Sequence, residues 1–465
     1  MAVQARYPTY RESGLPWVSK VPQGWSVLRN GRLFAHRVQT GFPDLPILEV
    51  SLRTGVRVRD MENLKRKQVI TQKEKYKRAA KGDIAYNMMR MWQGALGPAP
   101  VDGLVSPAYV VVKPFEEANS TYYSYLFRTD AYMREVNKFS RGIVADRNRL
   151  YWDEFKQMPS LVPPRPEQDQ IVAYLRAQDA QIARFIKTKR DLIDLLNEQK
   201  LRIIDHAVTR GLDASVALKP SGIEWLGDVP EHWSIKPLKR WVRLNASTLG
   251  EKTNPDFEFR YVDIGSVKTG RLAKELERLR FGNAPSRARR VLRRGDTIIS
   301  TVRTYLKAMW YVNDEADDLI ASTGFAVLTP EREVEPEYLG YVIQSTGFVN
   351  RVTANSIGIA YPAIAETVLG RLPVVMPSTL EEQQVILTHI KAESAPLDQA
   401  IEQALTEIKL IREYRDRQIA DVVTGQVDVR GWVPDPDDVV AEEDLAALGG
   451  DEEIDTDGEE DDGDD

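Results

Sequence analysis

The sequence contains one long pattern twice, and no other feature constrains its fold more. The motif Ser-Gly-(x)2-Trp-(x)3-Val-Pro-(x)2-Trp-Ser begins at Ser13 and again at Ser221, an offset of 208 residues. A second motif, Glu-Gln followed by regularly spaced apolar residues, begins at Glu167 and again at Glu382, an offset of 215 residues. A period of about 20 to 50 residues would indicate a solenoid. A period of about 210 residues instead predicts two copies of a larger unit with pseudo-twofold character.

The composition is that of a globular protein. The 465 residues, 42% of them hydrophobic, are enough for about three or four domains. No run of about 18 apolar residues exists, so no membrane span is expected. The first residues lack the apolar region of a secretory signal. The absence of cysteine excludes disulfides and thiolate metal sites and leads us to expect a cytoplasmic location.

The net charge of -6 conceals two regions of opposite sign. Residues 435–465 contain 17 Asp and Glu and no Lys or Arg. The rest of the chain holds 63 basic and 52 acidic residues, a net charge of about +11. A basic body favours nucleic acid as a partner, although an ordinary soluble surface is the alternative. The acidic segment is predicted to be disordered and either increases solubility or mimics DNA phosphate.

Each copy divides into a mixed α+β part and a helical part. Strands are predicted at 47–50 and 109–112 in the first copy, and at 261–264, 297–299 and 325–328 in the second. The expected domains are globular at 1–160 and 218–376, helical at 161–217 and 377–434, and a disordered acidic tail at 435–465. The fold class is therefore α+β, with two globular domains in pseudo-twofold arrangement joined by two long helices.

Apolar residues at spacings of 3, 4 and 7 mark one stripe on each long helix. The first stripe runs from Ile171 to Ile203 and the second from Ile386 to Ile419. A helix of about 40 residues would be a rod of roughly 60 Å. Neither rod can bury its stripe alone, so an antiparallel coiled-coil stem is the simplest arrangement. Pro396 predicts a break or restart in the second helix.

Motifs for catalysis and cofactor binding are absent. The four histidines are isolated from one another, and neither a GxxxxGK nor a GxGxxG loop occurs. Asn254-Pro255-Asp256-Phe257 lacks the second proline of a DNA-amino methyltransferase motif. Two Glu-x-Lys triplets, at Glu198 and Glu407, fall on the predicted helices, where these residues are ordinary helix formers. We therefore predict no catalytic, cofactor-binding or metal-binding residues in this chain.

Basic and aromatic residues cluster in both globular parts. Arg and Lys neutralise phosphates, and Arg also reads guanine edges in the major groove. Gly82-Asp83…Arg90-x-Trp92 matches Gly295-Asp296…Arg303-x-Tyr305 at an offset of 213, which predicts a shared loop after a strand. The DNA-binding candidates of the first copy are Arg53, Arg57, Arg59, Lys65, Arg66, Lys67, Arg90, Trp92, Arg141, Arg147 and Arg149. Those of the second are Lys268, Arg271, Arg287, Arg289, Arg290, Arg303, Tyr305 and Lys307.

The ordered, duplicated motifs resemble those of the specificity subunit of type I restriction-modification systems. The likeness spans Ser13 to Trp432 and rests on the repeated Trp motif, the helix openings Pro166-Glu167-Gln168 and Leu380-Glu381-Glu382-Gln383, and the similar helix ends Val208-Thr209 and Val423-Thr424. The acidic tail is the main departure from the family pattern.

This resemblance implies two target-recognition domains, each of which reads one half of a split, asymmetric sequence in double-stranded DNA. It implies a helical stem that sets the spacing and binds two modification (methyltransferase) subunits, with restriction (translocase/nuclease) subunits completing the enzyme. S-adenosylmethionine, ATP and Mg would then lie on those partners, and no membrane would be involved. A stand-alone DNA-modifying enzyme and a coiled-coil scaffold protein are the alternatives.

Overall fold

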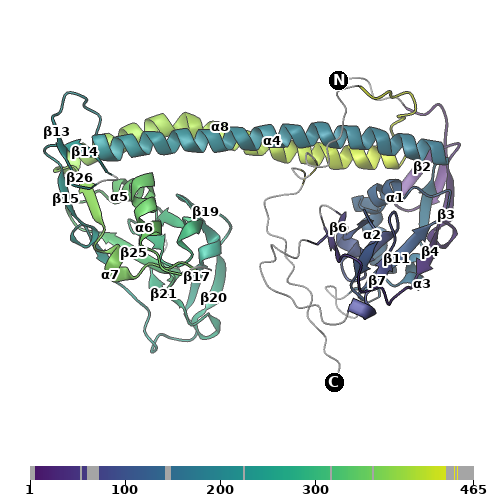
Figure 1. Cartoon of the computed structure of the whole chain (residues 1–465), viewed down its shortest axis with the longest axis horizontal. Coiled ribbons are helices and arrows are strands. Elements are labelled where there is room, and N and C mark those ends of the chain that lie inside the picture. The colour runs from purple at the N-terminus through teal and green to yellow at the C-terminus, as the bar shows by residue number, and fades with distance from the viewer. Residues whose placement is uncertain are drawn as a thin grey trace. The chain divides into compact units, whose positions relative to one another are not determined.

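The computed structural model describes residues 6–52, 55–59, 73–141, 148–223, 226–314, 317–358 and 361–435, with Leu445 and Leu448. The chain forms two compact units, shown in Figure 1. Unit 1 combines Met1–Asp191 with Ala404–Asp465, and unit 2 is Leu192–Gln403. Each unit therefore contains a segment of both long helices. Nearly all of the predicted acidic tail lies outside the described residues.

A four-stranded antiparallel sheet with the same strand order forms the centre of each unit. In unit 1 the order is β4 (Phe34–Arg37), β11 (Tyr109–Pro114), β8 (Ile84–Asn87) and β9 (Leu96–Pro98). In unit 2 it is β16 (Val242–Leu244), β25 (Phe325–Pro330), β22 (Thr297–Ser300) and β23 (Met309–Tyr311). The repeat in the sequence is thus a repeat of topology, and the predicted strands at 109–112, 297–299 and 325–328 are confirmed.

Smaller strands flank each central sheet. Unit 1 has the hairpin β5 (Leu48–Ser51) and β6 (Gly55–Val58), and the antiparallel pair β7 (Lys77–Ala79) and β10 (Gly103–Val105). Unit 2 has the sheet β20 (Glu277–Arg280), β17 (Glu258–Val262), β24 (Leu319–Ser322) and β21 (Ala288–Val291), and the hairpin β18 (Val267–Lys268) and β19 (Arg271–Leu272). The prediction of a strand at 261–264 extends two residues too far, because the carboxylate of Asp263 accepts a hydrogen bond from the backbone N of Ser266 and turns the chain.

Short helices lie against the sheet regions, and α5 lies beside β25 in Figure 1. They are α1 (Ser120–Phe127), α2 (Asp130–Phe139) and α3 (Trp152–Phe155) in unit 1, and α5 (Pro336–Gln344), α6 (Thr346–Ala354) and α7 (Glu366–Leu369) in unit 2. The remaining strand pairs are β1 (Tyr10–Leu15) with β2 (Val18–Pro22), β3 (Ser26–Arg29) with β12 (Pro159–Val162), β13 (Leu218–Pro220) with β14 (Asp228–Pro230), and β15 (Ser234–Pro237) with β26 (Pro373–Met376).

The two long helices are α4 (Arg165–Arg210) and α8 (Leu380–Val423). Their segments are antiparallel within unit 1, where Tyr174, Asp179 and Lys189 of α4 contact Gln418, Arg415 and Glu407 of α8 in that order. In unit 2, Nζ of Lys200 lies 2.6 Å from Oδ1 of Asp398. The predicted antiparallel pairing of the helices is confirmed. Among the described helices, none combines the length and the apolar character needed to cross a membrane.

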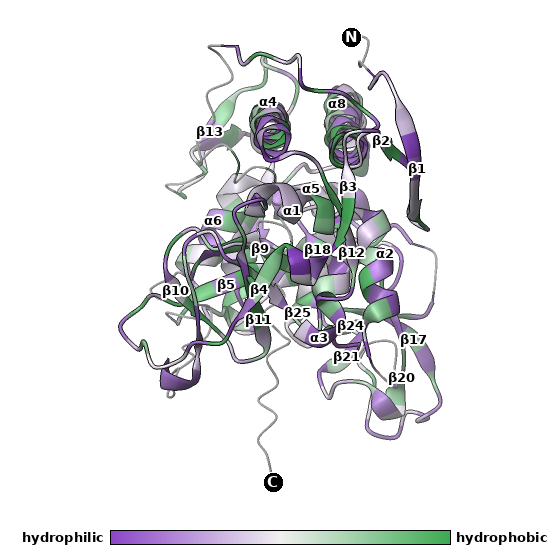
Figure 2. Cartoon of the chain, turned by 90° about the vertical axis from the view of Figure 1, so that its right-hand side faces the viewer, coloured by the Kyte–Doolittle hydropathy of each residue, from purple (hydrophilic) through white to green (hydrophobic). Residues whose placement is uncertain are grey.

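The apolar stripes are confirmed in part. Both long helices carry hydrophilic as well as hydrophobic residues in Figure 2. Ile171, Ile186 and Ile390 are fully buried, as the spacing predicts. Leu405 is 48% exposed, whereas its neighbour Ala404 is buried. The stripe on α8 is therefore one residue out of register there, and the small side chain of Ala404 faces the interior.

Pro396 does not break α8, and that expectation is wrong. The proline is exposed, so the carbonyl of Ala392, which loses its helical donor, lies on a side of the helix that water can reach. A proline on the solvent side of a long helix is tolerated where packing on the opposite side holds the helix together. The buried side chains of Ile390 and Ser394 lie on that packed side.

The repeated tryptophans join the ends of the long helices to the globular parts. In unit 1, Nε1 of Trp25 donates to Oε1 of Glu167, at the start of α4, over 3.0 Å. In unit 2, Nε1 of Trp233 donates to Oε1 of Glu382, at the start of α8, over 2.8 Å. Both tryptophans are buried, so the hydrogen bond satisfies an indole N–H that water cannot reach.

The repeated glutamines fix the same helix starts through further hydrogen bonds. The Gln168 side chain donates to the carbonyls of Glu117 and Pro163 and accepts from the backbone N of Asn119. Gln383 donates to the carbonyls of Glu333 and Pro377 and accepts from Glu335. Both glutamines are buried and use three hydrogen bonds. The Glu-Gln motif is therefore explained by structure, as a clamp at the start of each long helix.

Candidate nucleic-acid interface

Corresponding turns follow the strands β8 and β22, as the matched Arg-x-aromatic pattern predicts. The turn of unit 1 contains a short 3-10 helix, Met91–Gln93, and that of unit 2 contains another, Thr304–Leu306. The two are separated by 213 residues, the same offset as the strands before and after them. Arg90 and Arg303 each precede the short helix, so both arginines occupy the same topological position.

The turn of unit 1 is packed against its own domain. The indole of Trp92 donates to the carbonyl of Met89 over 2.9 Å and packs against the core of unit 1. Arg90 is half-buried. The turn closes at Gly94, whose φ of 89° suits glycine. Trp92 thus has a structural role in unit 1.

The turn of unit 2 projects its side chains into solvent. Tyr305 is 53% exposed and Leu306 45% exposed. Arg303 and Lys307 bracket them with φ values of 51° and 49°, in the left-handed region that non-glycine residues adopt at a cost. The Arg303 guanidinium lies over the ring of Tyr361, 5.0 Å from its centroid. Neither Arg303 nor Lys307 forms an ion pair with any residue that the structure describes.

A second basic hairpin of unit 2 lies beside this turn. Lys268 and Arg271 are exposed residues of the β18–β19 hairpin. Its turn is attached to the strand end at Lys307, because the hydroxyl of Thr269 donates to the carbonyl of Lys307 over 2.9 Å. Within the described chain, Lys268 and Arg271 likewise have no acidic partner. The structure thus brings together Lys268, Arg271, Arg303, Tyr305 and Lys307.

The other candidates of unit 2 lie at or next to β21 and have contacts of their own. The Arg290 guanidinium forms an ion pair with Glu366 over 2.5 Å. Arg289 lies over the ring of Phe281, 4.6 Å from its centroid. Nε of Arg287 donates to the hydroxyl of Tyr261 over 3.4 Å. These arginines have structural roles in the flanking sheet and are not part of the cluster at the β22–β23 turn.

The described candidates of unit 1 are mostly charge-compensated. Arg57 forms an ion pair with Glu49, and Nε of Arg59 lies 3.9 Å from a carboxylate oxygen of the same residue. Arg141 pairs with Glu154 over 2.6 Å. Arg149 is exposed and bonds to Arg141 through the backbone. The predicted candidates Arg53, Lys65, Arg66, Lys67 and Arg147 lie outside the described residues.

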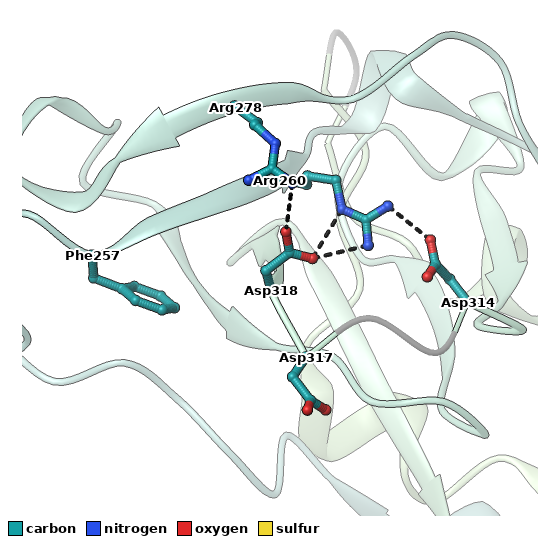
Figure 3. A pocket seen from close by; sticks show the side chains of 6 residues that line it. All are labelled: Phe257, Arg260, Arg278, Asp314, Asp317 and Asp318. Atoms are coloured by element: carbon teal, nitrogen blue, oxygen red, sulfur yellow. Dashed lines mark hydrogen bonds and ion pairs between the residues drawn. The ribbon is translucent and has the colours of Figure 1, made fainter.

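An open pocket of about 580 Å³ lies in the flanking sheet of unit 2. Figure 3 shows Arg260 between Asp314 and Asp318. Arg278 forms an ion pair with the other carboxylate oxygen of Asp318. The hydrogen bond to Asp314 contributes most to a raised pKa of Arg260. The two arginines are therefore ion-paired with aspartates of the same pocket. No group of carboxylates or histidines among the described residues is arranged to hold a metal ion.

Three exposed apolar residues in or next to the β22–β23 turn were not predicted from the sequence. Leu306 lies in the turn itself, and Ile357 and Tyr361 lie between α6 and α7, 84% and 65% exposed. The only signal was a run of apolar residues around Gly358 in a segment without helical or strand periodicity. Because that segment is distant in the sequence from the turn, only the fold places the two together.

No protein-family model matches the sequence, and no curated protein is significantly similar to it. Among solved structures, the chain is similar to one described under complex assembly and conformational transition of the type I R-M (restriction-modification) system. The TM-score is 0.55 at 15% identity, over 88% of this chain and 100% of that chain.

Two further solved structures match less closely. The HsdS subunit from Thermoanaerobacter tengcongensis has a TM-score of 0.35 and 17% identity, over 87% of this chain and 96% of that one. The type I restriction-modification S subunit from M. genitalium has a TM-score of 0.33 and 12% identity, over 86% and 96%. On the first of the three likenesses, this chain has the fold of a chain from a type I restriction-modification system.

Proposed function

We propose that this chain is the DNA-reading specificity subunit of a type I restriction-modification system. The observation that carries the proposal is the repeated topology, in which each unit presents an Arg-x-aromatic turn at the same position of the same sheet. Two corresponding surfaces suit a double-stranded DNA target with two half-sites. The excess of basic residues before the acidic tail supplies the attraction to phosphate.

In this proposal the chain is not a catalyst. Its units read the two halves of an asymmetric sequence, and the long helices bind two methyltransferase subunits, which restriction subunits join. S-adenosylmethionine, ATP and Mg bind to those partners. The absence of phosphate-loop and methyltransferase motifs from the sequence supports the assignment of cofactor binding and catalysis to the partner subunits. The protein works in the cytoplasm, where its DNA lies.

Methylome sequencing of the source cells, with the gene intact, deleted and restored, tests the proposal. We expect one split, asymmetric motif to lose its methylation on deletion and to regain it on restoration. Methylation that is unchanged by the deletion would contradict the proposal. Methyl transfer by the purified chain without partners would favour the alternative of a stand-alone enzyme.

A scaffold that joins proteins without reading DNA is the other alternative. Binding of the chain to random duplex DNA at about 50 and 200 mM salt distinguishes it, since phosphate contacts weaken steeply with salt. A DNA-reading subunit should bind at low salt and lose roughly 10-fold or more in affinity at the higher salt. A scaffold should show no binding at either concentration.

A further inference from the structure

Four exposed side chains form an apolar tip on unit 2. They are Tyr305 and Leu306 in the β22–β23 turn, and Ile357 and Tyr361 between α6 and α7. Exposed apolar residues are common singly, but a group of them indicates a binding site. These four residues are called the apolar tip below.

The backbone beneath the apolar tip is firmly held. The hydroxyls of Thr304 and Ser356 lie 2.9 Å apart and join the two segments. Ala363 forms bridges with both Val302 and Ile357, and the backbone N of Ile364 donates to the carbonyl of Thr301 over 2.9 Å. Thr301 and Thr304 are buried. The exposed side chains are therefore presented from a rigid base, which lowers the entropy lost on binding.

The charges around the apolar tip identify its partner. Arg303 and Lys307 flank the turn, and Lys268 and Arg271 lie on the adjoining hairpin. Within the described residues none of the four has an acidic partner. An apolar surface surrounded by unpaired cations fits DNA, whose bases offer apolar faces and thymine methyl groups between rows of phosphates.

The backbone strain points to the same place. The described non-glycine residues with positive φ are Asn245, Arg303 and Lys307, and two of these bracket the turn that carries Tyr305 and Leu306. Strained backbone of this kind concentrates at functional sites, because the surrounding structure must hold it in place. The strain fixes the direction in which the turn projects.

We propose that the apolar tip makes the sequence-dependent base contacts of unit 2, with Ile357 and Leu306 packed on apolar base surface. The surrounding cations Lys268, Arg271 and Lys307 bind phosphate and carry no sequence preference. This assignment rests on the proposed DNA-reading function and deepens it, since it separates the residues that specify from those that only bind.

The test measures binding of labelled duplexes by the full chain in complex with its co-purifying methyltransferase. One duplex carries the methylated motif and the other a scrambled sequence. Ile357→Ala and Leu306→Ala should each weaken binding to the motif about 10-fold and leave the scrambled duplex and the salt slope unchanged. Lys307→Gln should weaken binding to both duplexes and reduce the slope of log affinity against log salt concentration by about 1. Leu218→Ala, an equally exposed apolar change in unit 2, should alter neither.

Uracil in place of each thymine of the motif identifies the base surface. If Ile357 contacts a thymine methyl, one uracil substitution reproduces the loss, and Ile357→Ala then adds little to it. If it stacks on a base face, no uracil substitution does so. The assignment would be overturned if Ile357→Ala and Leu306→Ala weakened binding to both duplexes equally, or to neither. It would also be overturned if these variants lost the methyltransferase subunit but still bound DNA as wild type does. A wild-type complex that binds no DNA would instead refute the proposed function.

Discussion

The indole of Trp25 donates a hydrogen bond to Glu167 over 3.0 Å, and the hydroxyl of Tyr7 donates to the same carboxylate oxygen over 2.6 Å. Burial of the Tyr7 hydroxyl and its hydrogen bond to Glu167 raise the pKa of Tyr7. The chain just after α8 approaches the same indole, since a Cβ added at Gly425 would lie 3.2 Å from the ring of Trp25. One buried tryptophan of the repeated motif thus meets the start of one long helix and the end of the other.

Glu167→Ala should destabilise unit 1 by about 1 to 3 kcal/mol, because it leaves the buried indole N–H of Trp25 without an acceptor. Glu382→Ala should do the same in unit 2 through Trp233. Denaturant unfolding measures both effects. Glu381→Ala, an exposed change one residue away, is the matched control and should lie within about 0.5 kcal/mol of wild type. Equal effects of all three changes would show that the hydrogen bonds are not the cause.

Gly425→Ala should destabilise unit 1 more than Gly211→Ala destabilises unit 2. Both glycines have positive φ, 74° and 71°, so both substitutions strain the backbone. A Cβ at Gly425 would lie 2.4 Å from Cδ of Pro22, whereas one at Gly211 would lie 3.2 Å from the ring of Trp233. We expect a cost of about 2 to 4 kcal/mol for the first and about 1 to 2 for the second in thermal unfolding.

The control for these glycines is Gly431→Ala, where an added Cβ meets no neighbour and no positive φ is required. Its unfolding midpoint should match that of wild type. If Gly211→Ala proves more harmful than Gly425→Ala, the packing at the two helix ends differs from that described above.

Arg415→Ala should cost about 3 kcal/mol, because it leaves the buried carboxylate of Asp179 with Tyr125 as its remaining side-chain donor. Lys200→Ala removes an ion pair of similar length between the same helices, but Asp398 is exposed. Its cost should stay below about 1 kcal/mol. Urea unfolding followed by helical circular dichroism compares the two, and similar costs would contradict the difference in burial.

The corresponding aspartates Asp83 and Asp296 should respond differently to substitution by Asn. Asp83 is buried in an ion pair with Arg37 over 2.5 Å, so Asp83→Asn should cost about 2 to 3 kcal/mol at neutral pH. Asp296 has no such partner among the described residues, and burial raises its pKa above the ordinary aspartate value. Asp296→Asn should therefore cost less at neutral pH.

The sign of the pH dependence follows from that raised pKa. The folded state holds the proton of Asp296 more tightly than the unfolded state does. The contribution of Asp296 to the free energy of unfolding is fully present below the pKa that Asp296 has in the unfolded chain. It is lost as the pH rises through the higher pKa that Asp296 has in the folded protein. The advantage of wild type over Asp296→Asn should shrink from about pH 4 towards neutral. Unfolding of both proteins across this range checks the trend, and an advantage that grows with pH would refute it.

The sequence predicted much of this architecture because the fold is duplicated. The repeated Trp, Glu and Gln residues marked the junctions, and the apolar spacing on α4 predicted the buried faces at Ile171 and Ile186. The shared position of Arg90 and Arg303 could also be predicted, because the same offset relates the strands around them.

The rest depended on tertiary contacts that the sequence pattern does not encode. Leu405 and Ala404 are both compatible with a helical stripe, and only packing selects the smaller side chain. Arg290 was a DNA-binding candidate like Arg303, but Glu366, distant in the chain, pairs with it. Ile357 becomes part of a candidate interface only because its segment bridges to the residues that follow β22.

Insertion of about one helical turn near Leu195 should lengthen the gap between the two halves of the recognised sequence and leave both halves unchanged. The reason is that a helix shared by both units would set their separation, and positions on one face of DNA recur about every 34 Å. Methylome sequencing of cells that carry the insertion measures the gap. An unchanged gap would refute this role of α4.

Methylomes of cells that carry Arg90→Ala or Arg303→Asn decide whether the two units read different halves of one DNA sequence. Asn is chosen at Arg303 because it tolerates the φ of 51° there. We predict that each variant relaxes recognition of one half-site only, and that the two variants affect opposite halves. Relaxation of the same half by both variants, or uniform loss of methylation at both halves, would contradict the assignment of one half-site to each unit.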